Sequence, residues 1–174
     1  KASEAAIKKL GTNAYLLHFA THAIADEENL MESRLYLSQG SDTTEDGILY
    51  ARELYGMDLV SPLTVLSACQ TARGPLQQGE GILSLARAFQ YAGSERVLTT
   101  LWQLDDEAGA FLSQHFFERL ASDEPIHSAL QGAKKDWLNR SDNYLAHPYF
   151  WSGFVLIGNG GPLETSQSFF QDNA

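Results

Sequence analysis

The chain alternates short, continuous apolar runs with longer segments in which apolar residues recur every three or four positions. The short runs are typical of buried strands, and the longer segments are typical of amphipathic helices. Strands joined by helices favour right-handed crossovers and a mainly parallel sheet. The predicted fold class is therefore α/β, a mainly parallel sheet flanked by helices. Strands are predicted at residues 15–21, 34–38, 63–68, 96–102 and 154–157, and helices at 48–55, 80–92, from 105 onward and from 125 onward.

Two segments interrupt this alternation, and the end of the chain departs from it. Residues 40–47 are polar and acidic, and residues 71–79 contain two Gly and a Pro, so both are predicted to be loops. With 44% hydrophobic residues in 174, the chain suits one globular domain with a real core. We expect this domain over residues 1–162 and a polar tail over residues 163–174.

Charge and cysteine content narrow the classes of function. The chain has 12 Lys and Arg against 22 Asp and Glu, a net charge of -10, and no basic stripe of the kind that binds nucleic acid. An acidic surface attracts basic proteins or peptides, although it also serves solubility alone. No apolar run approaches the ~20 residues that span a bilayer, and the first residues lack the order of a signal peptide. The missing basic stripe and the short apolar runs lead us to expect neither a nucleic-acid nor a membrane partner. A single cysteine excludes an intrachain disulfide and fits a reducing compartment, so we expect a cytoplasmic protein.

The candidate chemistry lies where two predicted strands end. His22 follows the strand at 15–21, and Cys69 follows the strand at 63–68. Parallel neighbouring strands lie ~4.8 Å apart and end at the same edge of a sheet, so both side chains are expected there. A Cys–His pair can supply a thiolate nucleophile and a proton donor for the leaving amine. The alternative is packing, because Cys is among the most buried residue types.

Four short motifs help to decide between the catalytic and the packing interpretation of His22 and Cys69. In chain order they are HFATH at 18–22, LSACQT at 66–71, LWQLDD at 101–106 and HPYFW at 147–151. Together they resemble the CHAT domain family. The resemblance implies a caspase-hemoglobinase fold, a relation to caspases and separases, and His22 and Cys69 as a catalytic dyad that needs no cofactor or metal. It also implies a helical-repeat (TPR-like) region upstream in a longer protein.

This resemblance predicts a cysteine endopeptidase that cleaves protein substrates in a regulated signalling or defence pathway. The oxyanion would be held by the backbone N–H groups of Ala23 and Cys69. The family usually has Gly after the catalytic His, and Gly permits backbone angles that Ala23 resists. Family members also carry further strands before the HFATH strand, so we expect the first strands of the sheet to be missing from this chain. Both departures keep a second function open, that of a catalytically weak or inactive caspase-like scaffold or interaction module.

Asp105 and Asp106 follow the predicted strand at 96–102 and have two interpretations. They can cap and charge the start of a helix, or they can form an acidic S1 pocket that pairs with a substrate Arg or Lys. Separases show a similar stretch and cleave after arginine, and by that resemblance Asp106 is the better match. The sequence therefore predicts cleavage after a basic P1 residue, with one Asp possible in each role.

Other polar residues receive structural interpretations. His18 lies four residues before His22 without the Glu of a zinc helix, so a metal is not expected there. Ser67 lacks the surroundings of a serine nucleophile. His147 and Trp151 are expected either to close the core around the last strand or to wall the substrate cleft.

Overall fold

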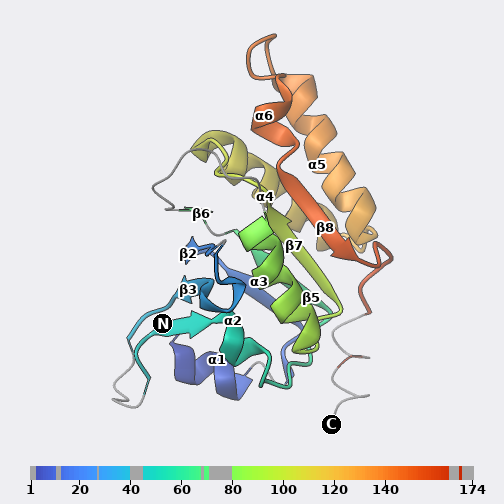
Figure 1. Cartoon of the computed structure of the whole chain (residues 1–174). Helices are drawn as coiled ribbons and strands as arrows, with labels where there is room; N and C mark the ends of the chain where they lie inside the picture. Colours follow the sequence, from blue (N-terminus) through green and yellow to red (C-terminus); the bar gives the residue numbers. More distant parts are fainter. Residues whose placement is uncertain are drawn as a thin grey trace.

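The predicted α/β class is confirmed by the computed structural model, in which helices flank a mainly parallel sheet (Figure 1). The structure describes residues 3–10, 13–26, 28–39, 45–67, 69–70, 80–164 and 169. Its first sheet has the order β1 (Leu16–Phe19), β5 (Leu63–Leu66), β7 (Arg96–Thr100) and β8 (Phe154–Gly158). The pairs β1–β5 and β5–β7 are parallel, and β8 runs antiparallel to β7.

A second sheet continues two strands of the first. Its order is β4 (Ile48–Tyr50), β3 (Arg34–Tyr36), β2 (His22–Ile24) and β6 (Cys69–Gln70). Strand β2 follows β1 after a break at residues 20–21, and β6 begins at Cys69 after β5 has ended at Leu66. The pair β2–β6 is parallel, like β1–β5 before it. The two chain segments therefore remain neighbours on both sides of the break.

The first sheet separates two hydrophobic cores. Alternate residues of a strand point to opposite faces, and accordingly Leu66 and Val97 pack in one core while Val65 and Leu98 pack in the other. The first core is covered by α1 (Glu4–Leu10), α2 (Ala51–Leu54) and α3 (Glu80–Tyr91). The second core is covered by α4 (Asp106–Leu120), α5 (Ile126–Arg140) and α6 (Pro148–Trp151). A short 3-10 helix, η2, spans Leu30–Glu32. In the described part of the chain, no helix combines the length and apolar character needed to cross a membrane.

One predicted element has the wrong type over part of its length. Residues 48–55 were expected to be a helix, but Ile48–Tyr50 form strand β4 and only Ala51–Leu54 are helical. Leu49 pairs with Leu35 of β3 and is fully buried, so tertiary pairing overrides the helical spacing. The helix begins where this pairing ends.

Candidate active site

The structure places His22 at the start of β2 and Cys69 at the start of β6, two parallel strands that are direct neighbours. The two residues are direct register partners in the pair β2–β6, and adjacent strands lie ~4.8 Å apart. His22 is exposed to solvent. The side chain of Cys69 and the loop at residues 71–79 lie outside the described residues. Backbone topology thus brings the two candidate residues side by side at one edge.

Ala23, the candidate oxyanion donor, lies within strand β2 between two neighbours. Its register partners are Leu35 of β3 on one side and Gln70 of β6 on the other. The residue is 1% exposed and belongs to the core beside α3. Among the described non-glycine residues only Asp123 has a positive φ. The backbone here therefore accepts Ala without the strain that would demand Gly.

The two aspartates after β7 differ in their surroundings. Asp105 is the N-cap of α4, where its Oδ1 accepts hydrogen bonds from the N–H of Glu107 (3.0 Å) and the N–H of Ala108 (3.1 Å). Asp106 is the first residue of the helix, and its side chain is exposed. The capping interpretation therefore applies to Asp105, whereas Asp106 makes neither of these capping bonds.

A small hollow of about 190 Å³ lies between the ends of β5 and β7 and the start of α4. Ser67 lines it, and this residue comes two positions before Cys69. Among the described residues that line the hollow none is Lys or Arg, so Asp105 and Asp106 give it a negative character. The lining residues are Ser67, Thr100, Gln103, Leu104, Asp105, Asp106, Gly109, Ala110 and Phe154.

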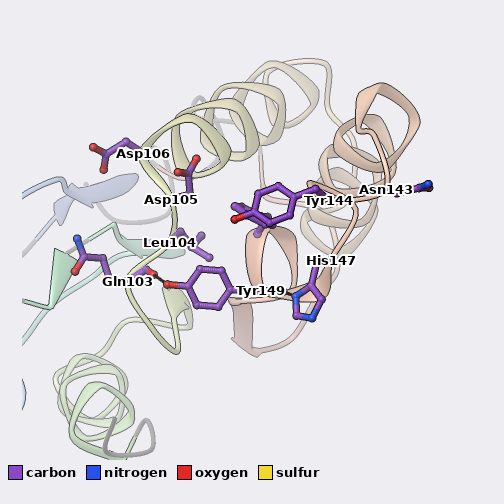
Figure 2. A pocket seen from close by; sticks show the side chains of 9 residues that line it. Gln103, Leu104, Asp105, Asp106, Asn143, Tyr144, His147 and Tyr149 are labelled. Atoms are coloured by element: carbon purple, nitrogen blue, oxygen red, sulfur yellow. Dashed lines mark hydrogen bonds between the residues drawn. The ribbon is translucent and has the colours of Figure 1, made fainter. Parts of the chain in front are cut away.

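A larger hollow of about 760 Å³ opens from the same turn (Figure 2). It shares Gln103, Leu104, Asp105 and Asp106 with the small one and continues to Asn143, Tyr144, His147, Tyr149 and Phe150. In Figure 2 Asp105 lies between Asp106 and Tyr144, and Asp106 extends away from the tyrosines. The start of α4 therefore forms a common border of both hollows.

His147 and Trp151, the two candidates in the HPYFW motif, have different surroundings in the structure. His147 lines the large hollow and caps α6, where its Nδ1 accepts a hydrogen bond from the N–H of Tyr149 (3.2 Å). Trp151 packs at the edge of the second core, and its Nε1–H donates to the carbonyl of Ala146 (3.0 Å). One residue thus walls a cleft and the other closes the core.

Tyr144 and Thr100 line the hollows but were not singled out in the sequence analysis. Tyr144 has no distinctive neighbours in the chain, and Thr100 lies in the predicted strand at 96–102. Gln103 and Tyr149 belong to the motifs LWQLDD and HPYFW, but no role was assigned to either residue. An exposed aromatic residue between a helix and the last strand is the cue that could have drawn attention to Tyr144. Only the fold reveals that Tyr144 and Tyr149 face the start of α4.

His18 packs as a strand residue with one polar partner. Its Nε2 lies 3.1 Å from Ser67 Oγ, and its ring contacts Phe117 at a centroid distance of 5.1 Å. Desolvation by this packing lowers the pKa of His18, although part of the side chain remains open to solvent. The hydrogen bond to Ser67 links His18 to a residue that lines the small hollow.

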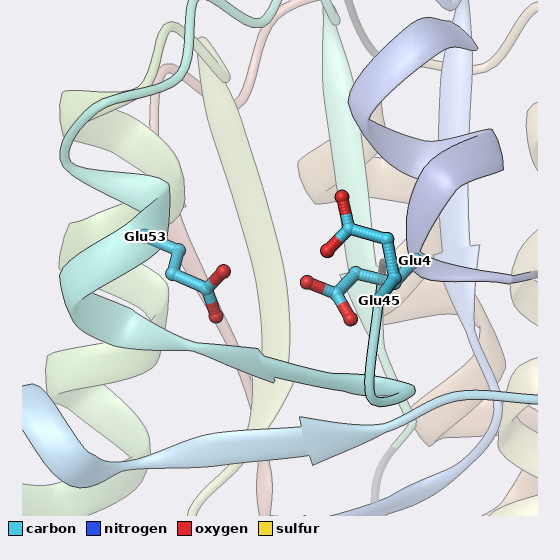
Figure 3. Close-up of side chains that lie close together, drawn as sticks. All are labelled: Glu4, Glu45 and Glu53. Atoms are coloured by element: carbon cyan, nitrogen blue, oxygen red, sulfur yellow. The ribbon is translucent and has the colours of Figure 1, made fainter. Parts of the chain in front are cut away.

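The described residues include one group of side chains with the spacing of metal ligands. The carboxylates of Glu4, Glu45 and Glu53 converge on a common centre within 4.8 Å of one another (Figure 3). The ammonium of Lys8 binds all three, at 2.7 Å, 2.8 Å and 3.1 Å respectively. Burial works against the charge of Lys8, but the hydrogen bonds to the three carboxylates outweigh it, and its pKa is raised. A metal ion would have to displace Lys8, so this cluster is a structural ion-pair network.

This network predicts a large stability loss for Lys8→Met. Glu4 is 2% exposed, and burial already raises its pKa. Without Lys8 its charge is buried and unpaired, so we expect the free energy of unfolding at pH 7.5 to fall by about 2–4 kcal/mol. An acid whose pKa is raised in the folded state destabilises less as pH falls, so the deficit should shrink toward about pH 5. Urea unfolding monitored by circular dichroism measures both effects.

Two variants control this prediction. Lys9→Met removes a neighbouring charge at an exposed position of α1 and should change stability by less than about 1 kcal/mol. Adding Glu4→Gln to Lys8→Met should recover much of the loss, because no unpaired charge remains buried. A Lys8→Met variant as stable as the wild type would show that the network does not hold α1 in place.

Comparisons with known proteins agree with this architecture. The family model "CHAT domain" matches residues 1–159. Among curated proteins the chain is similar to tetratricopeptide repeat protein 28 of Mus musculus, with 32% identity over 121 residues, and of Homo sapiens, with 30% identity over 121 residues. Each match covers 70% of this chain but only 5% of the relative. The fold, the strand register and the extent of the family match together establish that the chain belongs to the CHAT domain family, which is related to caspase-like peptidases.

Proposed function

We propose that the protein is a cysteine endopeptidase in which Cys69 is the nucleophile and His22 the general acid and base. The observation that carries the proposal is the direct register pairing of His22 with Cys69. Membership of a family related to caspase-like peptidases supports it. The small acidic hollow is lined by Ser67, two residues before Cys69, and offers a place for the substrate side chain.

The proposed reaction is acyl transfer through the thiolate. The sulfur of Cys69 attacks the carbonyl carbon of the scissile bond, and the N–H groups of Cys69 and Ala23 stabilise the oxyanion. Protonated His22 gives its proton to the leaving amine, so the C–N bond breaks and a thioester remains. Water, deprotonated by His22, then attacks the thioester and releases the carboxylate product. No cofactor enters any step.

The P1 side chain is proposed to be Arg or Lys, bound by Asp106 with Asp105 beside it. A cation in the small hollow would meet negative charge without a competing Lys or Arg among the described lining residues. One carboxylate oxygen of Asp105 already accepts the two capping hydrogen bonds of α4, whereas Asp106 accepts neither of them. Asp106 is therefore the principal partner in the proposal, and a charge-assisted hydrogen bond gives the preference.

The wider context is also part of the proposal. The relatives are named as tetratricopeptide repeat proteins. We propose that helical repeats in the full-length protein, in the cytoplasm, present the protein substrate and regulate the dyad.

Selective alkylation of Cys69 tests the proposal. A peptide with a C-terminal arginyl acyloxymethyl ketone should label the intact protein once, because Cys69 is the single cysteine. Labelling should be at least about 100-fold faster than in the denatured protein, since the folded site activates the thiol and orients the probe. Replacing His22 by Ala should slow it by about 10²-fold. Intact-protein mass spectrometry over time measures these rates.

The same assay separates the peptidase from a scaffold. A probe with uncharged citrulline in place of arginine should react more slowly with the wild-type protein, because it cannot pair with Asp106. Equal labelling rates of folded and denatured protein by both probes would favour the inactive scaffold.

A further inference from the structure

The large hollow beside the candidate S1 pocket has two aromatic walls that the proposed chemistry does not use. Tyr144 is 74% exposed and Tyr149 is 48% exposed, and both line the hollow. Exposed aromatic side chains that lie together around one hollow mark binding surfaces more often than single, scattered exposed residues do. The two tyrosines share one cavity with Asp105 and Asp106.

The aromatic walls are held in place by their neighbours. Tyr149 stacks on Trp102 with an interplanar angle of 14°, and its hydroxyl donates to the carbonyl of Gln103 (3.3 Å). The indole N–H of Trp102 donates to the carbonyl of Tyr149 (3.0 Å). Tyr144 packs edge-on against Phe150 at 5.3 Å. The rings are therefore positioned before any ligand arrives, which reduces the ordering cost of binding.

The chemistry of the hollow favours a cation. The faces of tyrosine rings attract ammonium and guanidinium groups. Asp105 and Asp106 add negative charge at the border, and none of the described lining residues is Lys or Arg. Arg140, on nearby α5, is paired with Glu107 and lies over Phe111, so it does not neutralise this border. The volume of about 760 Å³ accommodates a long side chain together with the backbone that carries it.

We propose that this aromatic and acidic hollow is a second substrate subsite that takes a second Arg or Lys side chain, so that the enzyme selects sequences with two basic residues. The inference rests on the proposed peptidase function. The two hollows share four residues at the start of α4, so the second basic residue lies close in sequence to P1. Asp106 faces the P1 side chain, and Asp105 with the two tyrosines faces the second cation.

A positional scan tests the inference. Peptides with Arg at P1 carry Arg, citrulline or Phe at each of the three positions on either side, and kcat/KM is measured for the intact protein. One position should favour Arg over citrulline by about fivefold to tenfold, the range expected for a cation on aromatic faces beside an acid. The preference should appear mainly in KM and should weaken in high salt.

Variants at Tyr144 identify the cause of the preference. Tyr144→Phe keeps the aromatic face and should keep the preference, whereas Tyr144→Leu keeps apolar volume and should reduce it to about twofold or less. Tyr91→Ala is the matched control, because Tyr91 is 72% exposed but lies on α3, away from the hollow. This variant should cleave every peptide as the wild type does.

The outcomes of these experiments distinguish a failure of the second subsite from a failure of the proposed peptidase function. A wild-type enzyme that cleaves after Arg but shows no second basic preference, or prefers Phe at the scanned position, overturns the second subsite and leaves the peptidase intact. A preference that survives Tyr144→Leu also overturns it. Failure to cleave any peptide, together with Cys69 labelling no faster than in denatured protein, overturns the proposed function itself.

Discussion

The Cys69→Ala variant is expected to lose at least about 10⁴-fold in kcat/KM against every peptide that the wild-type protein cleaves. The reason is that no other residue can replace the thiolate, since the chain contains one cysteine. Ser67, two positions earlier, is hydrogen-bonded to His18 rather than held at the dyad. Cleavage is measured by mass spectrometry of peptides with Arg at P1, with wild type and variant at equal concentration.

The His22→Gln variant tests the second residue of the proposed dyad. His22 is exposed and lies in a three-residue strand, so its replacement should change the free energy of unfolding by less than about 1 kcal/mol. Its kcat should nevertheless fall by about 10²–10⁴-fold, because the leaving amine loses its proton donor. Undiminished cleavage by the Cys69→Ala variant would show that the dyad is not the catalytic centre.

The position of this dyad could be predicted because it depends only on where two strands end. Apolar runs locate the strands that precede His22 and Cys69, and a parallel arrangement places their ends together. The continuation of the chain into β2 and β6 could not be predicted, because the apolar runs end at residues 21 and 68 and the pairing beyond them depends on contacts between segments distant in sequence. Near the first break, the hydroxyl of Thr21 donates to the carbonyl of Tyr36, a contact between segments that local sequence does not encode.

The two hollows beside the start of α4 could be predicted only in part. Asp105 and Asp106 are adjacent in sequence, and capping rules name both as candidates without separating them. The separation follows from backbone geometry, since Asp105 precedes the helix and Asp106 begins it. The tyrosines opposite them come from the segment after α5, which reaches the start of α4 only when both helices pack on the same face of the sheet. The HPYFW motif contains Tyr149, but the position of the tyrosines opposite α4 is a tertiary property that neither periodicity nor the motif predicts.

Asp106 should determine the proposed P1 preference. In Asp106→Asn we expect kcat/KM for peptides with Arg or Lys at P1 to fall by about 30-fold to 100-fold, because the cation enters the small hollow without its charged partner. The exposure of Asp106 in the free protein keeps the expected loss below that of a fully buried pair. Peptides with citrulline at P1 should lose less than about threefold, since they bring no positive charge.

Asp105→Asn provides the matched control for this last prediction. Asn is as good an N-cap as Asp, so the start of α4 should persist, and one negative charge is removed from the same turn. If Asp106 is the specific partner, the loss for Arg peptides in Asp105→Asn stays below about fivefold, as expected for a neighbouring charge at an exposed site. Equal losses in both variants would mean that the hollow senses only the summed charge. Equal losses for Arg and citrulline peptides in Asp106→Asn would mean that Asp106 supports the turn and does not contact the P1 side chain.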